Sequence, residues 1–210
     1  MLRLFVSRHG QTIWNTQKRM QGWKDSPLTD LGIRNAIELG NRLNQVEFQG
    51  VYSSPLRRTV DTADLIIRGR QIPIVTDENL REMNMGDWEG QVQEDIKKED
   101  PELFHKFWNK PHLYIPESGE AFIDVQRRAL LAIERIQREQ HSGNVLVVTH
   151  TIVIKSLLAY YKQIGIENLW DPPFIHDTSL TLIEVDHNGS QIVFEGDSTH
   201  RSIPNEKVTK

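Results

Sequence analysis

The sequence predicts an α/β fold, a three-layer α/β/α sandwich with a mostly parallel mixed sheet and a small helical cap insertion. Short apolar runs alternate with longer segments whose apolar residues recur at helical spacing. Residues 91–118 break this alternation with charged and aromatic residues and prolines. A chain of 210 residues suffices for one domain with a substantial core. We therefore expect a single domain over residues 1–210.

The first half of the chain supplies three expected strands and two helices. The apolar run at residues 2–6 predicts the first strand. Thr29 suits the N-cap of a helix that continues to about residue 44, because apolar residues follow it at helical spacing. Residues 50–53 predict the second strand, and Pro55 suits the first turn of the next helix. Residues 72–75 predict the third strand.

The segment 91–118 is expected to form a cap of short helices and loops, since prolines interrupt it. Phe104, Phe107 and Trp108 fall on one helical face, which favours a small subdomain core over a substrate-binding wall. The insertion contains no arginine.

The second half of the chain resumes the alternation. It predicts a long helix over residues 120–140, a strand over 144–149 and a helix over 151–163. Two apolar runs, at 180–185 and 192–195, flank an Asn-Gly turn and predict a closing antiparallel hairpin.

Composition limits the function. The net charge of −4 and the absence of a long basic run argue against a nucleic-acid partner. The chain has no cysteine, which excludes disulfides and thiolate metal sites. No apolar stretch approaches the length of a membrane span, and the start does not resemble a secretory signal. We expect a cytoplasmic protein whose polar tail, about residues 201–210, is loose.

Three residues that follow the first strand are the strongest candidates for a binding site. Ligands of open α/β sheets bind beyond the carboxyl ends of the strands, where Arg8, His9 and Gly10 are expected. Arginine offers a planar fork of donors that matches phosphate, and imidazole can act as nucleophile or acid. Glycine allows close approach of the backbone. The tripeptide therefore indicates phosphate chemistry.

Five separated segments resemble, in the same order, the histidine phosphatase superfamily, also called the phosphoglycerate mutase-like family. The resemblance covers most of residues 1–200 and is carried by residues 8–15, 21–32, 53–59, 80–90 and 147–150. It implies the phosphoglycerate mutase-like sandwich. In this family, the histidine of the Arg-His-Gly turn attacks phosphorus while a backbone carbonyl holds its other ring N–H.

The resemblance assigns expected roles residue by residue. His9 matches the nucleophile, and Arg8, Arg58 and His150 match the groups around the phosphoryl group, with His150 in its positive form. Glu82 matches the general acid and base.

Four further residues are candidates for substrate binding. Asn15 would add a neutral donor, and Gln21 and Gly22 belong to the segment that resembles the phosphate loop. Thr151 stands where many members have glycine, so its hydroxyl would either cap the next helix or reach the substrate. His200 ends an Asp-x-x-His pattern seen in some phosphatases and is a weaker candidate.

The expected acid, Glu82, has apolar neighbours. Met83, Met85 and Trp88 would raise its pKa and keep it protonated for donation.

The resemblance implies a metal-independent phosphomonoester hydrolase, without a cofactor, that acts on small phosphorylated metabolites through a phosphohistidine on His9. No phosphate-and-metal motif accompanies the aspartates that could bind Mg²⁺ in principle: Asp61, Asp64, Asp171 and Asp177. The first alternative is a cofactor-dependent phosphoglycerate mutase, which the cap's lack of arginine disfavours. The second is a non-catalytic regulatory binding protein, which the complete set of matching residues disfavours.

The sequence does not choose the substrate. Ionisable residues of the cap are candidates for contacting an anionic end of it: His105, Lys106, Lys110 and His112. Trp170 and Phe174 flank a Pro-Pro pair and would form either the edge of a homodimer interface or a packed loop.

Overall fold

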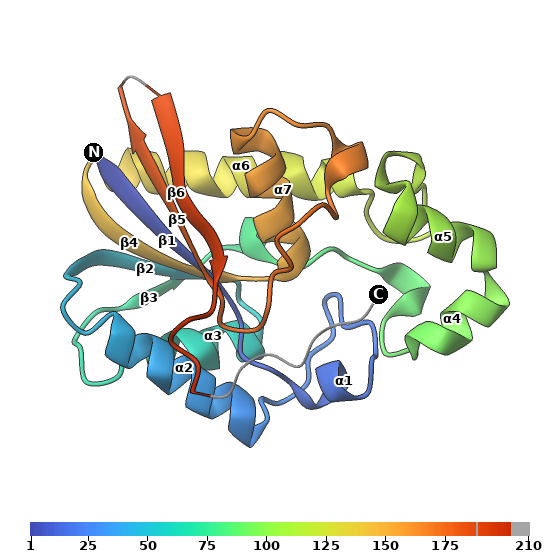
Figure 1. Ribbon diagram of the computed structural model, residues 1–210, viewed down its shortest axis with the longest axis horizontal. Coiled ribbons are helices and arrows are strands. Elements are labelled where there is room, and N and C mark those ends of the chain that lie inside the picture. Colours follow the sequence, from blue (N-terminus) through green and yellow to red (C-terminus); the bar gives the residue numbers. More distant parts are fainter. Residues whose placement is uncertain (188, 203–210) are drawn as a thin grey trace.

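The computed structural model describes residues 1–187 and 189–202. These residues form a six-stranded sheet in the order β3-β2-β4-β1-β5-β6. The strands are β1 (Leu2–Arg8), β2 (Phe48–Ser53), β3 (Ile74–Thr76), β4 (Gly143–Thr149), β5 (Leu180–Asp186) and β6 (Gly189–Asp197). β1 to β4 run parallel, and the hairpin of β5 and β6 adds the antiparallel pairs. The mixed sheet is therefore as predicted (Figure 1).

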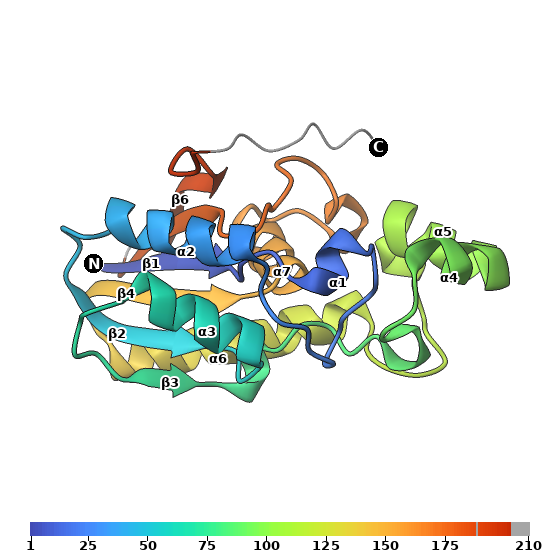
Figure 2. The same ribbon diagram turned by 90° about the horizontal axis from the view of Figure 1, so that it is seen from below.

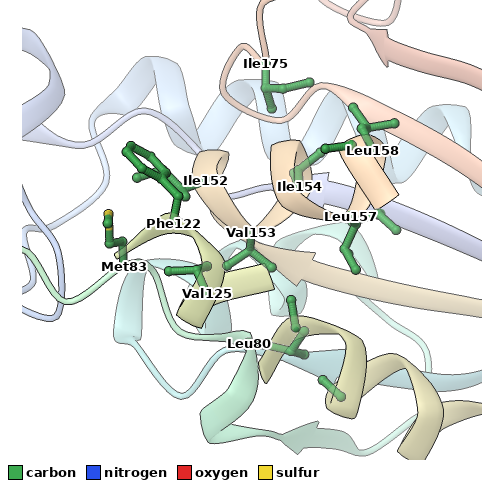
Figure 3. Close-up of a cluster of buried hydrophobic side chains, with 14 of the residues drawn as sticks. Leu80, Met83, Phe122, Val125, Ile152, Val153, Ile154, Leu157, Leu158 and Ile175 are labelled. Carbon is green, nitrogen blue, oxygen red and sulfur yellow. The ribbon is translucent and has the colours of Figure 1, made fainter. Parts of the chain in front are cut away.

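Side chains alternate between the two faces along each strand, so apolar residues lie on both faces of the sheet. Helices cover each face. Leu4 and Val6 of β1 belong to one buried cluster, whereas Phe5 belongs to the cluster on the opposite face. Helices α6 (Phe122–Glu139) and α7 (Thr151–Tyr161) supply the first cluster (Figure 3). Helices α2 (Asp30–Arg42) and α3 (Arg57–Ile66) supply the second (Figure 2). This is the predicted three-layer sandwich.

The remaining helices gather near the carboxyl ends of the parallel strands, where α4 and α5 form the helical cap (Figures 1 and 2). The helices are α1 (Ile13–Thr16), α4 (Gln93–Glu99) and α5 (Pro101–Asn109). Short 3₁₀ turns are η1 (Glu78–Leu80), η2 (Gly86–Trp88), η3 (Pro111–Leu113) and η4 (Ile166–Asn168). Within the described ranges, no helix combines the length and apolarity that a membrane span requires.

Several predicted boundaries need correction. Thr29 caps α2 as expected, but the helix ends at Arg42 rather than near residue 44. Helix α3 begins at Arg57, two residues after Pro55, because Asp25 Oδ2 accepts the Arg57 N–H at 2.6 Å and fixes the first turn there. β6 is longer than predicted because its polar ends also pair with β5.

The first two residues of the expected loose tail, Arg201 and Ser202, have defined contacts with the domain. The Arg201 guanidinium lies 3.2 Å from Asp177, and Ser202 bonds to Glu38 through both its N–H and its hydroxyl. These two residues are therefore held against the domain. Residues 203–210 of the expected loose tail, like Asn188 of the predicted turn, lie outside the described residues.

Candidate active site

A cavity of about 360 Å³ opens beyond the carboxyl ends of β1 and β4. Eight of the residues predicted from sequence line it: Arg8, His9, Asn15, Gln21, Gly22, Arg58, Glu82 and Thr151. His150 is fully buried immediately behind them, with its ring centroid 5.3 Å from that of His9. The fold thus brings together residues from both halves of the chain.

His9 has a defined tautomer. Its Nδ1 atom lies 2.7 Å from the carbonyl oxygen of Gly10, which can only accept a hydrogen bond, so Nδ1 carries the proton. Burial, reinforced by the charges of Arg58 and Arg8, holds the pKa of His9 well below its ordinary value. The ring is therefore neutral at neutral pH, and its Nε2 atom keeps a lone pair.

Two arginines place positive charge beside His9. Arg8 Nη1 donates to the Ile175 carbonyl at 2.9 Å. Arg58 is buried, and its Nη groups donate to the carbonyls of Gly22 and Lys24 and to Asp25. The Nε atoms of both arginines are buried, and neither has a hydrogen-bond partner among the described residues. A buried charged donor without a partner is costly, so these groups suit an anion.

The contacts of His150 favour its neutral form, whereas the sequence analysis expects the positive form. Arg58 Nη2 can only donate, so His150 Nδ1, at 3.2 Å from it, is the acceptor. His150 Nε2 then carries the proton and donates to Ser54 Oγ at 2.9 Å. Burial holds the pKa of His150 well below its ordinary value, and the charge of Arg58 lowers it further. A proton on His150 Nδ1 as well would place that N–H donor opposite the Nη2 donor of Arg58.

Glu82 is a buried carboxyl group at the cavity wall. Burial raises its pKa, although the Met83 N–H bond and the charges of Arg58, Arg8 and Arg128 oppose that shift. Met83, Met85 and Trp88 are themselves buried, as predicted. The expected direction of the pKa shift is confirmed.

The four candidate substrate-binding residues differ in what they offer. Asn15 Oδ1 accepts from the N–H and the hydroxyl of Thr12, so its amide nitrogen is the group available to donate. Gly22 has a φ of +54°, which favours glycine, and its carbonyl anchors Arg58. Gln21 Oε1 is buried with no partner in the described part of the chain. The N-cap of α7 is His150, so Thr151 does not cap the helix and borders the cavity instead.

The outer wall of the cavity is aromatic. Phe107, Trp108, Trp170 and Phe174 line it, and Trp170 Nε1 donates to the Phe107 carbonyl at 2.6 Å. Phe107 is only 1% exposed, so it belongs to the predicted cap core and to the wall at once. Trp170 packs within this wall against the rings of Phe107, Trp108 and Phe122.

Sequence reasoning missed the residues that hold the site together. Asp25 pairs with Arg58, Ser54 bonds to His150, and Glu89 Oε1 joins the backbone of Trp23 to that of Met85. Lys18, Arg19, Gln11 and Gln93 add polar groups to the cavity lining. Gln11, Ser54 and Glu89 lie in segments that resemble the family, but the sequence assigned them no role of their own.

Other expectations were wrong. The cap residues offered for an anionic end do not line the cavity: His105, Lys106, Lys110 and His112. His200 bonds to the Thr178 hydroxyl at 3.3 Å and also stays outside the cavity lining.

Across residues 1–187 and 189–202, no cluster of three or more His, Cys, Asp or Glu side chains is arranged to hold a metal ion.

Comparisons with known proteins agree with this geometry. Residues 4–198 match the family described as the histidine phosphatase superfamily (branch 1). The adenosylcobalamin/alpha-ribazole phosphatase of Escherichia coli strain K12 is 36% identical over 169 residues, which are 80% of this chain and 83% of that protein. Phosphoserine phosphatase 1 of Hydrogenobacter thermophilus is 27% identical over 170 residues, 81% of each chain.

A solved structure extends the likeness to the whole fold. Bacillus stearothermophilus YhfR superposes with a TM-score of 0.94 at 46% identity, over 95% of this chain and 99% of that one. The sheet order, the cavity at the strand ends and the family match agree. The chain belongs to the histidine phosphatase superfamily, branch 1.

Proposed function

We propose that this protein hydrolyses phosphate monoesters of small metabolites in two displacements on His9. The observation that carries the proposal is the Nδ1 contact of His9 with the Gly10 carbonyl, which leaves Nε2 as the nucleophile beside two arginines. The phosphatase relatives and the cavity size support small phosphate esters as substrates. The unit is one domain, residues 1–210, with residues 91–118 as its cap.

The first displacement transfers the phosphoryl group to the enzyme. His9 Nε2 attacks phosphorus, and the bond from phosphorus to the ester oxygen breaks. The protonated Glu82 carboxyl gives its proton to the departing oxygen, so that an alcohol leaves. The raised pKa of Glu82 supports this role, because an ordinary glutamate would be ionised at neutral pH.

The second displacement returns the enzyme to its starting state. Glu82, now a carboxylate, takes a proton from water as the water oxygen attacks the phosphohistidine. The P–N bond breaks, inorganic phosphate forms and His9 Nε2 regains its lone pair. Arg8 and Arg58 stabilise the charge on the phosphoryl oxygens in both steps. Neutral His150 keeps Arg58 aligned by accepting from its Nη2.

The lining of the cavity also suggests how the rest of the substrate is held. Phe107, Trp108, Trp170 and Phe174 would contact an organic leaving group, while Asn15 and Thr151 would donate to the phosphoryl oxygens. No resident metal or cofactor takes part in this scheme. We place the protein in the cytoplasm, with no nucleic-acid or membrane partner; a homodimer stays a prediction for size-exclusion chromatography.

Hydrolysis of p-nitrophenyl phosphate by the wild type and by a His9→Ala variant tests the function. Loss of turnover in the variant is the expected result, and equal rates would favour the non-catalytic binding protein. Conversion of 3-phosphoglycerate to its 2-isomer, stimulated by the bisphosphate, would favour the mutase instead.

A further inference from the structure

We propose that Arg128, oriented by Glu120, is a positioning residue that holds the general acid Glu82 at the reacting ester; this inference rests on the function proposed above. Arg128 belongs to α6 and does not line the cavity, so it would act only through its neighbours.

The Arg128 guanidinium donates hydrogen bonds to the backbone of residues 79–82, which we call the acid segment because it ends at Glu82. Its Nη1 donates to the carbonyl oxygens of Asn79, at 3.0 Å, and Arg81. Its Nη2 donates to the carbonyl oxygen of Glu82 at 2.9 Å. One planar fork therefore fixes three carbonyls along four consecutive residues. These bonds fix the backbone from which the Glu82 side chain starts.

Glu120 orients the fork. Its Oε1 lies 2.8 Å from Arg128 Nε and its Oε2 lies 2.9 Å from Nη2, a bidentate pair. Oε2 also accepts the Asn84 N–H at 2.7 Å, and the Asn84 carbonyl accepts the Glu120 N–H at 2.9 Å. The pair thus holds the chain on both sides of Glu82.

Packing reinforces these bonds. Leu80 and Met83, which flank Glu82, are fully buried and belong to the same cluster as Phe122 and Val125 of α6 (Figure 3). The Trp23 indole N–H also donates to the Glu82 carbonyl at 2.8 Å. The acid segment therefore packs on α6 through apolar side chains, and Arg128 adds the polar contacts between them.

The charge and the shape of Arg128 have separable effects. Its charge lowers the pKa of Glu82, against the effect of burial. A lysine would keep the charge but could not make the same fork. Arg128→Lys therefore tests the position of Glu82. Arg128→Gln also removes the charge that lowers the pKa of Glu82, so the alkaline limb of the pH profile of kcat/KM should move to higher pH.

The test measures kcat/KM on phosphate esters whose leaving alcohols span a wide range of pKa. Poor leaving groups need the acid, so Glu82→Gln should steepen the dependence on leaving-group pKa. Arg128→Lys should steepen it in the same sense, with a loss of about tenfold or more on alkyl phosphates and less than about twofold on p-nitrophenyl phosphate. The double variant should lose little beyond Glu82→Gln on alkyl phosphates.

Controls separate this role from a general loss of structure. Arg127→Lys changes the neighbouring arginine of α6, whose side chain is 71% exposed, and should leave all rates unchanged. Glu120→Gln keeps Arg128 but weakens its orientation and the bond to the Asn84 N–H, so it should give a smaller steepening and serves if Arg128→Lys does not fold. An equal loss across all esters in these variants would overturn the proposal. If Glu82→Gln leaves the dependence of kcat/KM on leaving-group pKa unchanged, Glu82 is not the acid, and Arg128 does not have the proposed role.

Discussion

The Nδ1 atom of His9 lies 2.7 Å from the carbonyl oxygen of Gly10, the residue that follows it. Because a carbonyl only accepts, this contact fixes the imidazole tautomer and orients the ring within one turn of chain. The nucleophilic nitrogen is thus selected before substrate binds. Burial of the ring and the charges of Arg58 and Arg8 lower the pKa of His9, so the ring stays unprotonated at Nε2.

Arg58 should be required for turnover. Arg58→Ala removes a buried positive group from the cavity wall and also frees the Gly22 carbonyl, so kcat/KM for p-nitrophenyl phosphate should fall about a hundredfold or more. Arg57→Ala is the matched control, because that side chain is 85% exposed. Comparable rates in the two variants would remove Arg58 from the phosphoryl site.

Glu82 should destabilise the fold at high pH. Its folded pKa is raised, so the folded chain binds the Glu82 proton more tightly than the unfolded chain does. Stability from this group is present below the ordinary glutamate pKa and is lost as pH rises through the raised folded value. The gain in Tm of Glu82→Gln over wild type should therefore be larger at about pH 8 than at about pH 4.

An exposed glutamate provides the control for this titration. Glu134 lies on the solvent side of α6, so Glu134→Gln is the control for a general effect of replacing glutamate by glutamine on Tm. A Glu82→Gln difference that shrinks as pH rises would show that the folded pKa is lowered, which contradicts the acid role.

The aromatic wall should select for the leaving group. Phe174 lines the cavity and is 52% exposed, so Phe174→Ala should raise KM for aryl phosphates about fivefold while changing inhibition by inorganic phosphate little. Tyr160 is equally exposed but lies outside the cavity lining, which makes Tyr160→Ala the control. Equal effects of Phe174→Ala on aryl and small alkyl esters would place the leaving group elsewhere.

Activity should persist without divalent metal. Arg8 and Arg58 supply the charge stabilisation in this scheme, so extended dialysis against a chelator should leave kcat unchanged. Loss of rate that added Mg²⁺ or Zn²⁺ restores would contradict the scheme.

The sequence predicted the sheet and the main helices from local signatures, whereas the resemblance to the family supplied Arg58, Glu82 and His150. Thr29 is recognisable as a cap from its neighbours, and the Arg8-His9-Gly10 turn follows an apolar run. The shift of the α3 start to Arg57 could not be predicted, since the group that fixes it, Asp25, lies 32 residues away.

The features that escaped prediction depend on tertiary contacts. Burial and the charge of Arg58, 92 residues away in the sequence, lower the pKa of His150, and Ser54, 96 residues away, bonds to its ring. Arg128 acts on backbone carbonyls, and carbonyls leave no trace in side-chain patterns. His105 was offered as a substrate contact because it is ionisable, but the residues of α5 that line the cavity are Phe107 and Trp108, and His105 is exposed outside the lining.

The central claim is tested most directly by trapping the enzyme during steady turnover with an alkaline quench and locating any phosphoryl group by mass spectrometry. The account predicts a phosphohistidine at His9 in the wild type and none in His9→Ala. Absence of the adduct under conditions that preserve a phosphohistidine standard, or its presence on His150, would contradict it.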